Sequence, residues 1–248
     1  MDQVTHVALS LATSMERALD VAANNIANAN TDGFRAERTT FGAFLAREEG
    51  RSEVGTRDYV IDRGSWIDGR AGPFARTGNP LDVALSEDGW LSYRLPDGAI
   101  AYGRDGNLTV SPDGVLTTHG GAAVLDEGGA DILLPVDAST IAIASDGTIT
   151  NPDGDVVSRL GILDIPDADG MVRVGQGLFA PPPGRSLATV PSDGARVIQG
   201  SLEGSNVVPV VEMTRLIEIQ RSYERAAQLM KSQDDLSRDA VRRLGRQS

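Results

Sequence analysis

Apolar residues near the start of the chain recur at the spacing of a helix. From Val4 to Ile26 they stand three to five positions apart, and the charged side chains lie outside this stripe. The period predicts an amphipathic helix, and the narrow stripe of partly small residues favours packing along another helix. An ordinary surface helix fits the period equally well. The Asn- and Gly-rich run 28–33 is expected to end the helix, because both residue types tolerate left-handed backbone conformations.

A second periodic stretch lies near the end of the chain. From Ile219 to Leu244 the pattern steps alternately by four and three positions, with Gln233 and Ser237 as polar members. These steps give the 3.5-residue period of a coiled-coil seam. A helix over about 208–244 would be ~55 Å long. Its seam is too weak to be buried on a domain core, so we expect it to pair with another helix.

Short β-strands and turns are expected between the two helices. The dipeptide Asp-Gly occurs ten times, and nine of these lie between residues 68 and 194. Asp-Gly suits tight hairpin turns because both residues can adopt positive φ. The intervening runs, such as 81–85, 90–95 and 162–165, alternate or are rich in β-branched residues. They predict an antiparallel β domain.

Together these patterns predict an α+β protein, in which a mainly antiparallel β domain is carried on terminal helices that pair as a coiled coil. We expect the N-terminal helix and turn at 1–38, an extended linker at 39–74, the β domain at 75–200 and the C-terminal helix at 201–248. Helices at both ends can also pack on neighbouring copies, which is typical of filament or tube subunits.

Polar motifs flank both predicted helices. Asn24 and Asn25 lower helix propensity, so we expect these residues, with Asn28, to lie against the C-terminal helix or a neighbouring subunit and their amides to bond to backbone there. Near the other end, Ser205 or Asn206 is placed to cap the C-terminal helix.

Composition and charge narrow the range of functions. The 248 residues carry 23 basic and 35 acidic side chains, a net charge of -12, which disfavours nucleic acid and anionic membrane as partners. Cysteine is absent and there are only two histidines, so disulfides, thiol nucleophiles and histidine-cluster metal sites are excluded. The N-terminus lacks the basic start and apolar run of a cleaved signal, and no stretch is long enough to insert in a membrane.

Motifs that resemble catalytic or ligand sites have simpler explanations. The adjacent acids Glu87 and Asp88 fit a hairpin turn better than a glycosidase pair. The run 151–155 resembles a calcium loop, but its glycine is misplaced for that motif. Whether another metal binds in the β-domain turns is left open. We therefore expect no enzyme activity, no catalytic residue, no cofactor, no metal ligand and no small-molecule substrate.

Longer motifs resemble the flagellar rod and hook family of axial proteins. They are Ala-Asn-Asn-Ile-Ala-Asn-Ala-Asn-Thr-Asp-Gly-Phe-Arg at 23–35, Gly-Asn-Pro-Leu-Asp-Val-Ala-Leu at 78–85, and Leu-Glu-Gly-Ser-Asn-Val at 202–207. The resemblance extends to 101–108 and 219–224. Within the family, the run 80–85 followed by Trp90 is more similar to proximal-rod than to distal-rod proteins.

The resemblance implies a structural subunit of the bacterial flagellar basal-body rod, located across the periplasm. It implies export through the flagellar type III apparatus without signal cleavage, and assembly with other rod proteins and copies of itself into a tube with a central export channel. The terminal helices would line that channel. A distal-rod subunit is the alternative within the family. A secreted β-domain binding module, dimerised by its helices, is the alternative outside it.

The expected assembly interface draws on both ends of the chain. It comprises Leu11, Met15, Ala22, Asn24, Asn25, Ile26, Asn28, Asn30, Thr31, Gly33, Phe34, Ser205, Asn206, Leu216, Ile219, Tyr223, Ala226 and Met230.

Overall fold

The computed structural model describes residues 2–46, 57–134, 140–166 and 168–244. It confirms an α+β protein, with two α-helices and mostly antiparallel strands in these ranges. The chain forms two compact units. The helix unit comprises Met1–Ile26, Glu37–Trp66 and Val208–Ser248, and the β unit comprises Ala27–Ala36 and Ile67–Val207.

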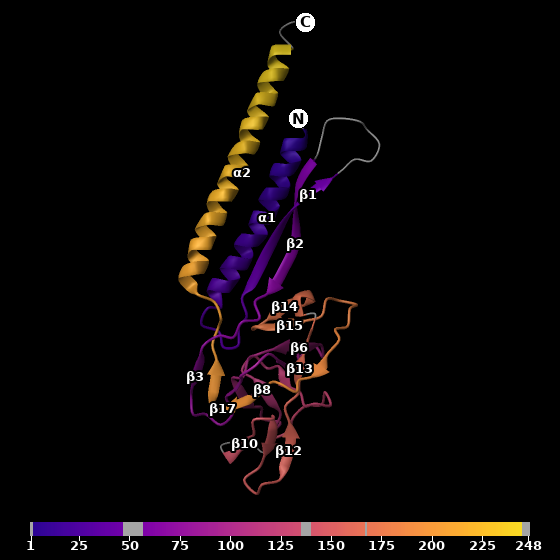
Figure 1. Ribbon diagram of the computed structural model, residues 1–248, viewed down its shortest axis with the longest axis vertical. Coiled ribbons are helices and arrows are strands. Elements are labelled where there is room, and N and C mark those ends of the chain that lie inside the picture. The colour runs from indigo at the N-terminus through magenta and orange to yellow at the C-terminus, as the bar shows by residue number, and fades with distance from the viewer. Residues whose placement is uncertain (1, 47–56, 135–139, 167, 245–248) are drawn as a thin grey trace. The chain divides into compact units, whose positions relative to one another are not determined.

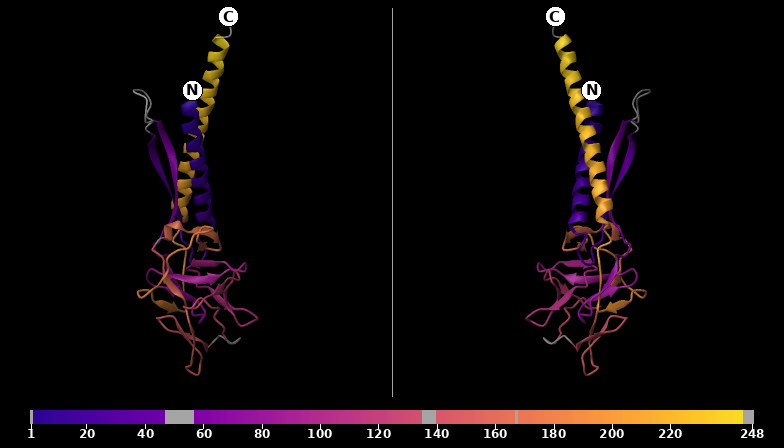
Figure 2. Two further views of the ribbon diagram at one scale, coloured as in Figure 1. Left: turned by 90° about the vertical axis from the view of Figure 1, so that its right-hand side faces the viewer. Right: turned by 90° about the vertical axis from the view of Figure 1, so that its left-hand side faces the viewer.

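The helix unit contains α1 (Asp2–Ala27, whose last residue belongs to the β unit) and the 36-residue α2 (Pro209–Leu244). Figures 1 and 2 show α1 and α2 side by side and antiparallel. Among the described side chains of this contact, Ala18 and Ala22 of α1 are buried with Ile219 of α2, and Met15, Leu19 and Leu216 are partly buried around them. Small residues at such a contact allow the helix axes to approach closely. The side chains of the expected seam members Gln233, Ser237, Ala240 and Leu244 lie outside the described residues.

The helix unit also contains a two-stranded sheet of β1 (Glu37–Ala46) and β2 (Arg57–Ile67). The sequence pattern predicts an extended linker at 39–74, whereas the structure has two paired strands over much of this range. Thr39, Phe41 and Tyr59 are among the β-branched and aromatic residues of this segment. Such residues favour a pleated backbone even where apolar and polar positions do not alternate.

The β unit is built from short strands. Their bounds are β3 (Phe74–Arg76), β4 (Val83–Leu85), β5 (Trp90–Arg94), β6 (Ile100–Gly103), β7 (Leu108–Val110), β8 (Leu116–Thr118), β9 (Ala123–Val124), β10 (Ala142–Ile143), β11 (Thr148–Thr150), β12 (Val156–Arg159), β13 (Ile162–Asp164), β14 (Val172–Gly175), β15 (Leu178–Ala180), β16 (Val190–Pro191), β17 (Val197–Gln199) and β18 (Ser201–Glu203), with a 3-10 turn, η2 (Ala168–Gly170), before β14.

Antiparallel pairing organises these strands into sheets. The largest has nine strands, in the order β14-β15-β6-β5-β9-β8-β7, with β13 beside β5 and β16 beside β13. A three-stranded sheet has the order β10-β11-β12, and two further pairs join β17 to β4 and β18 to β3. The last two pairs bring the end of the β unit back to its beginning (Figure 1).

Several turns form at the predicted Asp-Gly positions, but their geometry differs from the expected one. Gly98, Gly114 and Gly147 have positive φ. Among the described residues, Gln176 is the one non-glycine with positive φ, so the preceding aspartates do not share the left-handed conformation. In the first turn the Gly98 N–H donates to the Leu95 carbonyl at 2.8 Å, as in a type I turn with proline at its second position. The glycine alone therefore supplies the left-handed residue.

The core of the β unit consists of two apolar clusters. The main one includes Leu91, Tyr93, Leu116 and Ile149, all at most 1% exposed. The second surrounds Trp90, whose ring meets that of Phe179 edge to face at a centroid distance of 5.8 Å, a favourable aromatic geometry. The β unit thus has a closed core of its own.

Candidate assembly interface

The predicted interface residues on the two helices differ widely in burial. Ala22, Asn25, Ile219 and Ala226 are buried, and Asn24 and Tyr223 are exposed. The remaining members on these helices are partly buried, namely Leu11, Met15, Ile26, Leu216 and Met230.

Large apolar side chains outside the predicted seam are exposed on α2. Val210, Met213, Ile217 and Leu229 are 50–72% exposed. The first three are three and four positions apart, so they lie on one face of the helix. This face is not part of the predicted seam, because the predicted heptad pattern begins at Ile219. The same spacing rule applied to the first two turns of α2 would have found it.

Asn25 joins three segments of the helix unit. Its side-chain oxygen accepts a hydrogen bond from the Glu37 N–H at 3.0 Å, and its amide donates to the Glu37 carbonyl at 2.9 Å. It also donates to Glu212 Oε2 on α2 at 3.4 Å. Glu212 is buried and forms an ion pair with Arg38. Asn25 thus contacts the C-terminal helix through the Glu212 side chain, while its backbone partner is Glu37. Its contact with a neighbouring subunit stays a prediction.

The rest of the N-terminal motif belongs to the β unit. Asn28 and Thr31 are partly buried and Asn30 is exposed, while Gly33 and Phe34 are buried. The Gly33 N–H donates to the Glu203 carbonyl at 2.6 Å, and its φ is +66°. A side chain at this position would collide with the Arg104 carbonyl, so glycine is required.

Phe34 is held within the β unit by apolar and cationic neighbours. It packs with Ala36 and Val207, and the Arg173 guanidinium lies 4.3 Å from the centre of its ring. The same guanidinium lies 4.6 Å from the ring of Phe179. A cation between two aromatic faces is a favourable electrostatic arrangement. The aromatic side chain of the N-terminal motif is therefore used inside its own unit.

A buried ion network lies beneath this motif. The Glu203 carboxylate receives Arg35 and Arg104, each at 2.7 Å, and also the Gly72 N–H at 3.0 Å. Arg104 donates further to the carbonyls of Leu85, Glu87 and Gly89 at 2.7–2.8 Å. All three charged side chains are buried, and burial lowers the pKa of Arg35 to about 10 despite the neighbouring Glu203. Arg35 therefore remains cationic at neutral pH.

Asn206 and Ser205 do not cap α2, which corrects the expectation from sequence. The Glu212 N–H donates to the Val208 carbonyl at 3.1 Å, and Pro209 is the first helical residue. Ser205 Oγ instead accepts the Val207 N–H at 3.2 Å, outside the helix. The amide of Asn206 bonds to residues 36, 68 and 70 of the β unit. Two residues lie between Asn206 and Pro209, so the cap expectation placed the helix start too early.

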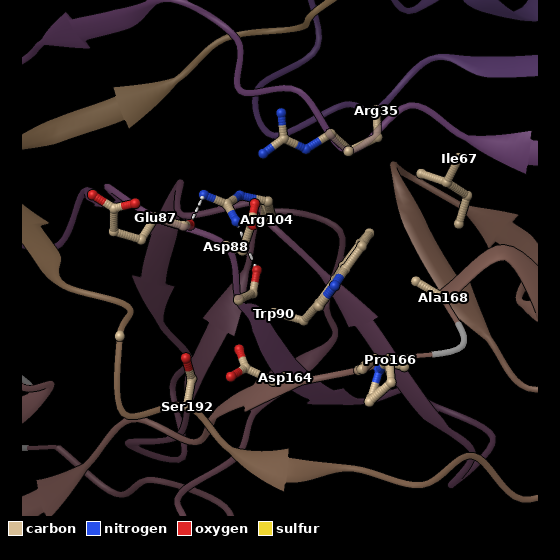
Figure 3. A pocket seen from close by; sticks show the side chains of 14 residues that line it. Arg35, Ile67, Glu87, Asp88, Trp90, Arg104, Asp164, Pro166, Ala168 and Ser192 are labelled. Atoms are coloured by element: carbon tan, nitrogen blue, oxygen red, sulfur yellow. Dashed lines mark hydrogen bonds between the residues drawn. The ribbon is translucent and has the colours of Figure 1, made fainter.

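The β unit has a pocket of about 780 Å³, and Arg35 and Arg104 of the ion network line it (Figure 3). Glu87 and Asp88 lie beside Arg104, and Trp90 and Asp164 also line the pocket. The arginines are engaged with Glu203, and the mixture of charges does not select a cation or an anion. No group of three or more His, Asp and Glu side chains that could hold a metal is present among the described residues.

Comparisons with known proteins identify the family. Three family models match: the flagella basal body rod protein at residues 8–35, the flagellar hook protein FlgE/F/G D1 domain at 84–151, and the flagellar basal body rod FlgEFG protein C-terminal at 198–243. The flagellar basal-body rod protein FlgF of Caulobacter vibrioides is 37% identical, over 99% of each chain. The chain belongs to the flagellar basal-body rod protein family.

Other relatives support the same placement. FlgF of Salmonella typhimurium is 39% identical over 95% of each chain, and FlgG of Agrobacterium fabrum is 31% identical over 88% of this chain and 90% of its own. The chain is a FlgF-like structural subunit of the bacterial basal-body rod, and the family implies assembly with other rod proteins there. Over the described parts of α1 and α2, neither helix is long and apolar enough to cross a membrane.

Sequence reasoning missed the buried charged residues that pair across distant segments of the chain. The first and third matches end and begin close to the residues that meet in the β unit, Arg35 and Glu203. Arg104 and Glu203 both stand inside motifs that carry the family resemblance, but they are 99 positions apart and no local period links them. Glu212 is buried as well, and no periodic pattern marks it. A buried charge pair between distant segments has no signature in a hydrophobic pattern.

Proposed function

We propose that the chain is a proximal-rod subunit that assembles through its helix unit into a tube with a central export channel. In this proposal α1 and α2 pair as a coiled coil and form the inner layer, as axial segments within 1–38 and 201–248. The β domain within 75–200 faces outward. The proposal includes export by the flagellar type III apparatus, partners among the rod proteins and copies of this chain, and no enzyme activity.

The unsatisfied apolar surface of the helix unit carries the proposal. Val210, Met213 and Ile217 are each at least half exposed on one face of α2. Burying such side chains contributes roughly 1.5–3 kcal/mol each. Exposed apolar residues grouped on one helix face are typical of an interaction surface. Of the predicted interface residues, those on α1 and α2 support the proposal best, because Gly33, Phe34, Ser205 and Asn206 are engaged within the β unit.

Charge substitutions on this face test the assembly role. We expect Met213→Asp with Ile217→Asp to abolish swimming and basal-body incorporation when the variant is the cell's sole copy of the subunit. The purified variant should keep the thermal unfolding midpoint of its β unit. The control is Val156→Asp, which changes a somewhat more exposed apolar residue on β12 of the β unit. Normal assembly of the double variant would contradict the proposal.

A distal-rod position is the second candidate, because relatives named FlgG also match over most of the chain. Cross-linking in intact basal bodies distinguishes the two positions. A proximal subunit should cross-link to other proximal-rod proteins and lie on the side of the rod nearer the cytoplasm. Cross-links to the hook alone would favour the distal position.

A further inference from the structure

The chain passes between its two units at four places. One passage, after Ile26, lies within helix α1. The other three follow Ala36, Trp66 and Val207. The segments of the β unit next to these three passages continue directly into β1, β2 and α2 of the helix unit. Any residue that ties these segments together inside the β unit fixes the spacing at which three elements of the helix unit are attached.

The side chain of Asn206 bonds to the β-unit segments next to two of these three passages, and Asn206 itself lies next to the third. Asn206 Oδ1 accepts the Ala36 N–H at 2.7 Å. Asn206 Nδ2 donates to the carbonyls of Asp68 and Arg70, both at 2.9 Å. Each partner lies next to one of the three passages. Asn206 is the second-last residue before the passage after Val207, and Ala36 is the last residue before the passage into β1. Asp68 is the second residue after the passage that follows Trp66.

Backbone hydrogen bonds reinforce the same junction. The Asn206 N–H donates to the Phe34 carbonyl at 3.3 Å, and the Asp68 N–H donates to the Ala36 carbonyl at 2.8 Å. The side chain uses both of its amide hydrogens and its oxygen. Aspartate keeps the shape but cannot donate, and alanine offers neither group. Asparagine is thus chemically specified here, and its role as a helix cap has already been excluded.

We propose that Asn206 is a positioning residue for rod assembly, because it holds the three β-unit segments that continue into β1, β2 and α2 in one fixed arrangement. The inference rests on the proposed assembly function. Subunits that repeat along a rod must all share one geometry, so a looser junction recurs as an error in every copy. Asn206 belongs to neither apolar cluster of the β unit, and it shares one partner with the ion network, the Arg70 carbonyl, to which Arg35 also donates.

Asn206→Asp, Asn206→Ala and a stability-matched control test the inference in the full chain. The control is Ile149→Val or Ile149→Ala, whichever lowers the thermal midpoint of the β unit by the same amount, since Ile149 lies in the main core cluster on β11. Each variant serves as the sole copy of the subunit in a motile strain. The readouts are swimming rate, the number of completed basal bodies and hydrogen exchange of the purified chain.

We expect both Asn206 variants to reduce completed basal bodies at least tenfold at a temperature where their β units are folded, while the control assembles normally. The Ala36 amide should exchange faster in Asn206→Ala and remain protected in Asn206→Asp, which keeps that acceptor. Equal assembly by the Asn206 variants and the matched control would overturn the inference. Unfolding of both Asn206 variants at growth temperature would also overturn it, because the residue would then act through stability alone. Normal swimming of a strain that lacks the chain altogether would instead refute the proposed assembly function.

Discussion

The two units of the molecule satisfy their apolar surface in different ways. In the β unit two clusters of buried side chains fill the space between short strands, and even its charged residues Arg35, Arg104 and Glu203 are paired inside. Among the side chains that the structure describes in the helix unit, Ala18, Ala22 and Ile219 form a buried apolar cluster. Larger side chains on α2 are exposed beside it.

The difference separates folding from assembly. Hydrophobic stabilisation is proportional to the apolar area removed from water, and a cluster with two alanines removes little. Ordering the backbone of two long helices costs about 1–2 kcal/mol per residue. We therefore expect the helix unit to gain much of its stability from neighbours, whereas the closed core of the β unit should stabilise it within one chain. Four predictions test this contrast, from the largest expected effect to the smallest.

Removing the charge of Glu203 should destabilise the β unit most. Glu203→Gln leaves the buried guanidinium groups of Arg35 and Arg104 without a counter-charge, which costs about 3–5 kcal/mol of unfolding free energy. Denaturant unfolding followed by Trp90 fluorescence, in a Trp66→Phe background, measures the loss. The control is Glu127→Gln, which removes an exposed ion pair with Arg159 and should have little effect. A loss no larger than that of the control would show that the network contributes nothing to stability.

Hydrogen exchange on dilute monomer should show the contrast directly. Amides of α1 and α2, represented by Leu11 and Tyr223, should exchange at least about a hundredfold faster than those of β5 and β6, a difference of about 2.8 kcal/mol in opening free energy. The protected set should include residues 33–36, because these belong to the β unit. Slow exchange at Leu11 and Tyr223 would mean that the helix unit is stable without neighbours.

Asp105 should make a contribution to the unfolding free energy of the β unit that increases as the pH falls from 7 towards 4. Burial, with a smaller contribution from the charge of Asp32, raises the pKa of Asp105 from 3.8 to about 6. The native state then binds a proton more tightly than the unfolded chain, so this stabilisation is present below pH 3.8 and is lost as the pH rises through 6. The expected size is about 1–3 kcal/mol.

Comparison with Asp105→Asn isolates this contribution from other groups that titrate in acid. The asparagine keeps an oxygen for the Asn107 N–H, which lies 3.1 Å from Asp105 Oδ1. The difference in unfolding free energy between wild type and variant should change with pH between 4 and 7. A constant difference over that range would refute the assignment to Asp105.

The smallest expected effect concerns the independence of the units. Ile219→Ala removes a buried side chain from the contact between α1 and α2. It should change the unfolding free energy of the β unit by less than about 0.5 kcal/mol, because Ile219 is not part of the β-unit clusters. Asn25→Leu should likewise leave β-unit unfolding unchanged while it reduces rod assembly. Unfolding monitored by Trp90 measures the first property, and swimming measures the second. A large shift of the β-unit transition would show that the two units unfold together.

Sequence patterns predicted the elements better than the connections between them. Both helices, the β domain and the Asp-Gly turns follow from local periodicity and turn chemistry, which operate over a few residues. The division of the N-terminal motif does not. Asn25 serves the helix unit, whereas Phe34 and Arg35 serve the β unit, and only long-range contacts reveal this. The exposed face of α2 was within reach of the pattern, but the buried pairing of Arg104 with Glu203 was not.

The junction of Ala36 with Asp68 has a consequence for how chains of this family can vary in length. The chain leaves the β unit after Ala36 and returns at Ile67, and a backbone hydrogen bond of 2.8 Å joins the two ends of this excursion. A loop whose ends are fixed together can gain residues at a cost that grows only with the logarithm of its length. Insertions or deletions between β1 and β2 can therefore lengthen or shorten the subunit while every strand of the β unit keeps its register. A position between β1 and β2 is therefore one where evolution, or a protein engineer, can add sequence without changing the fold of the β unit.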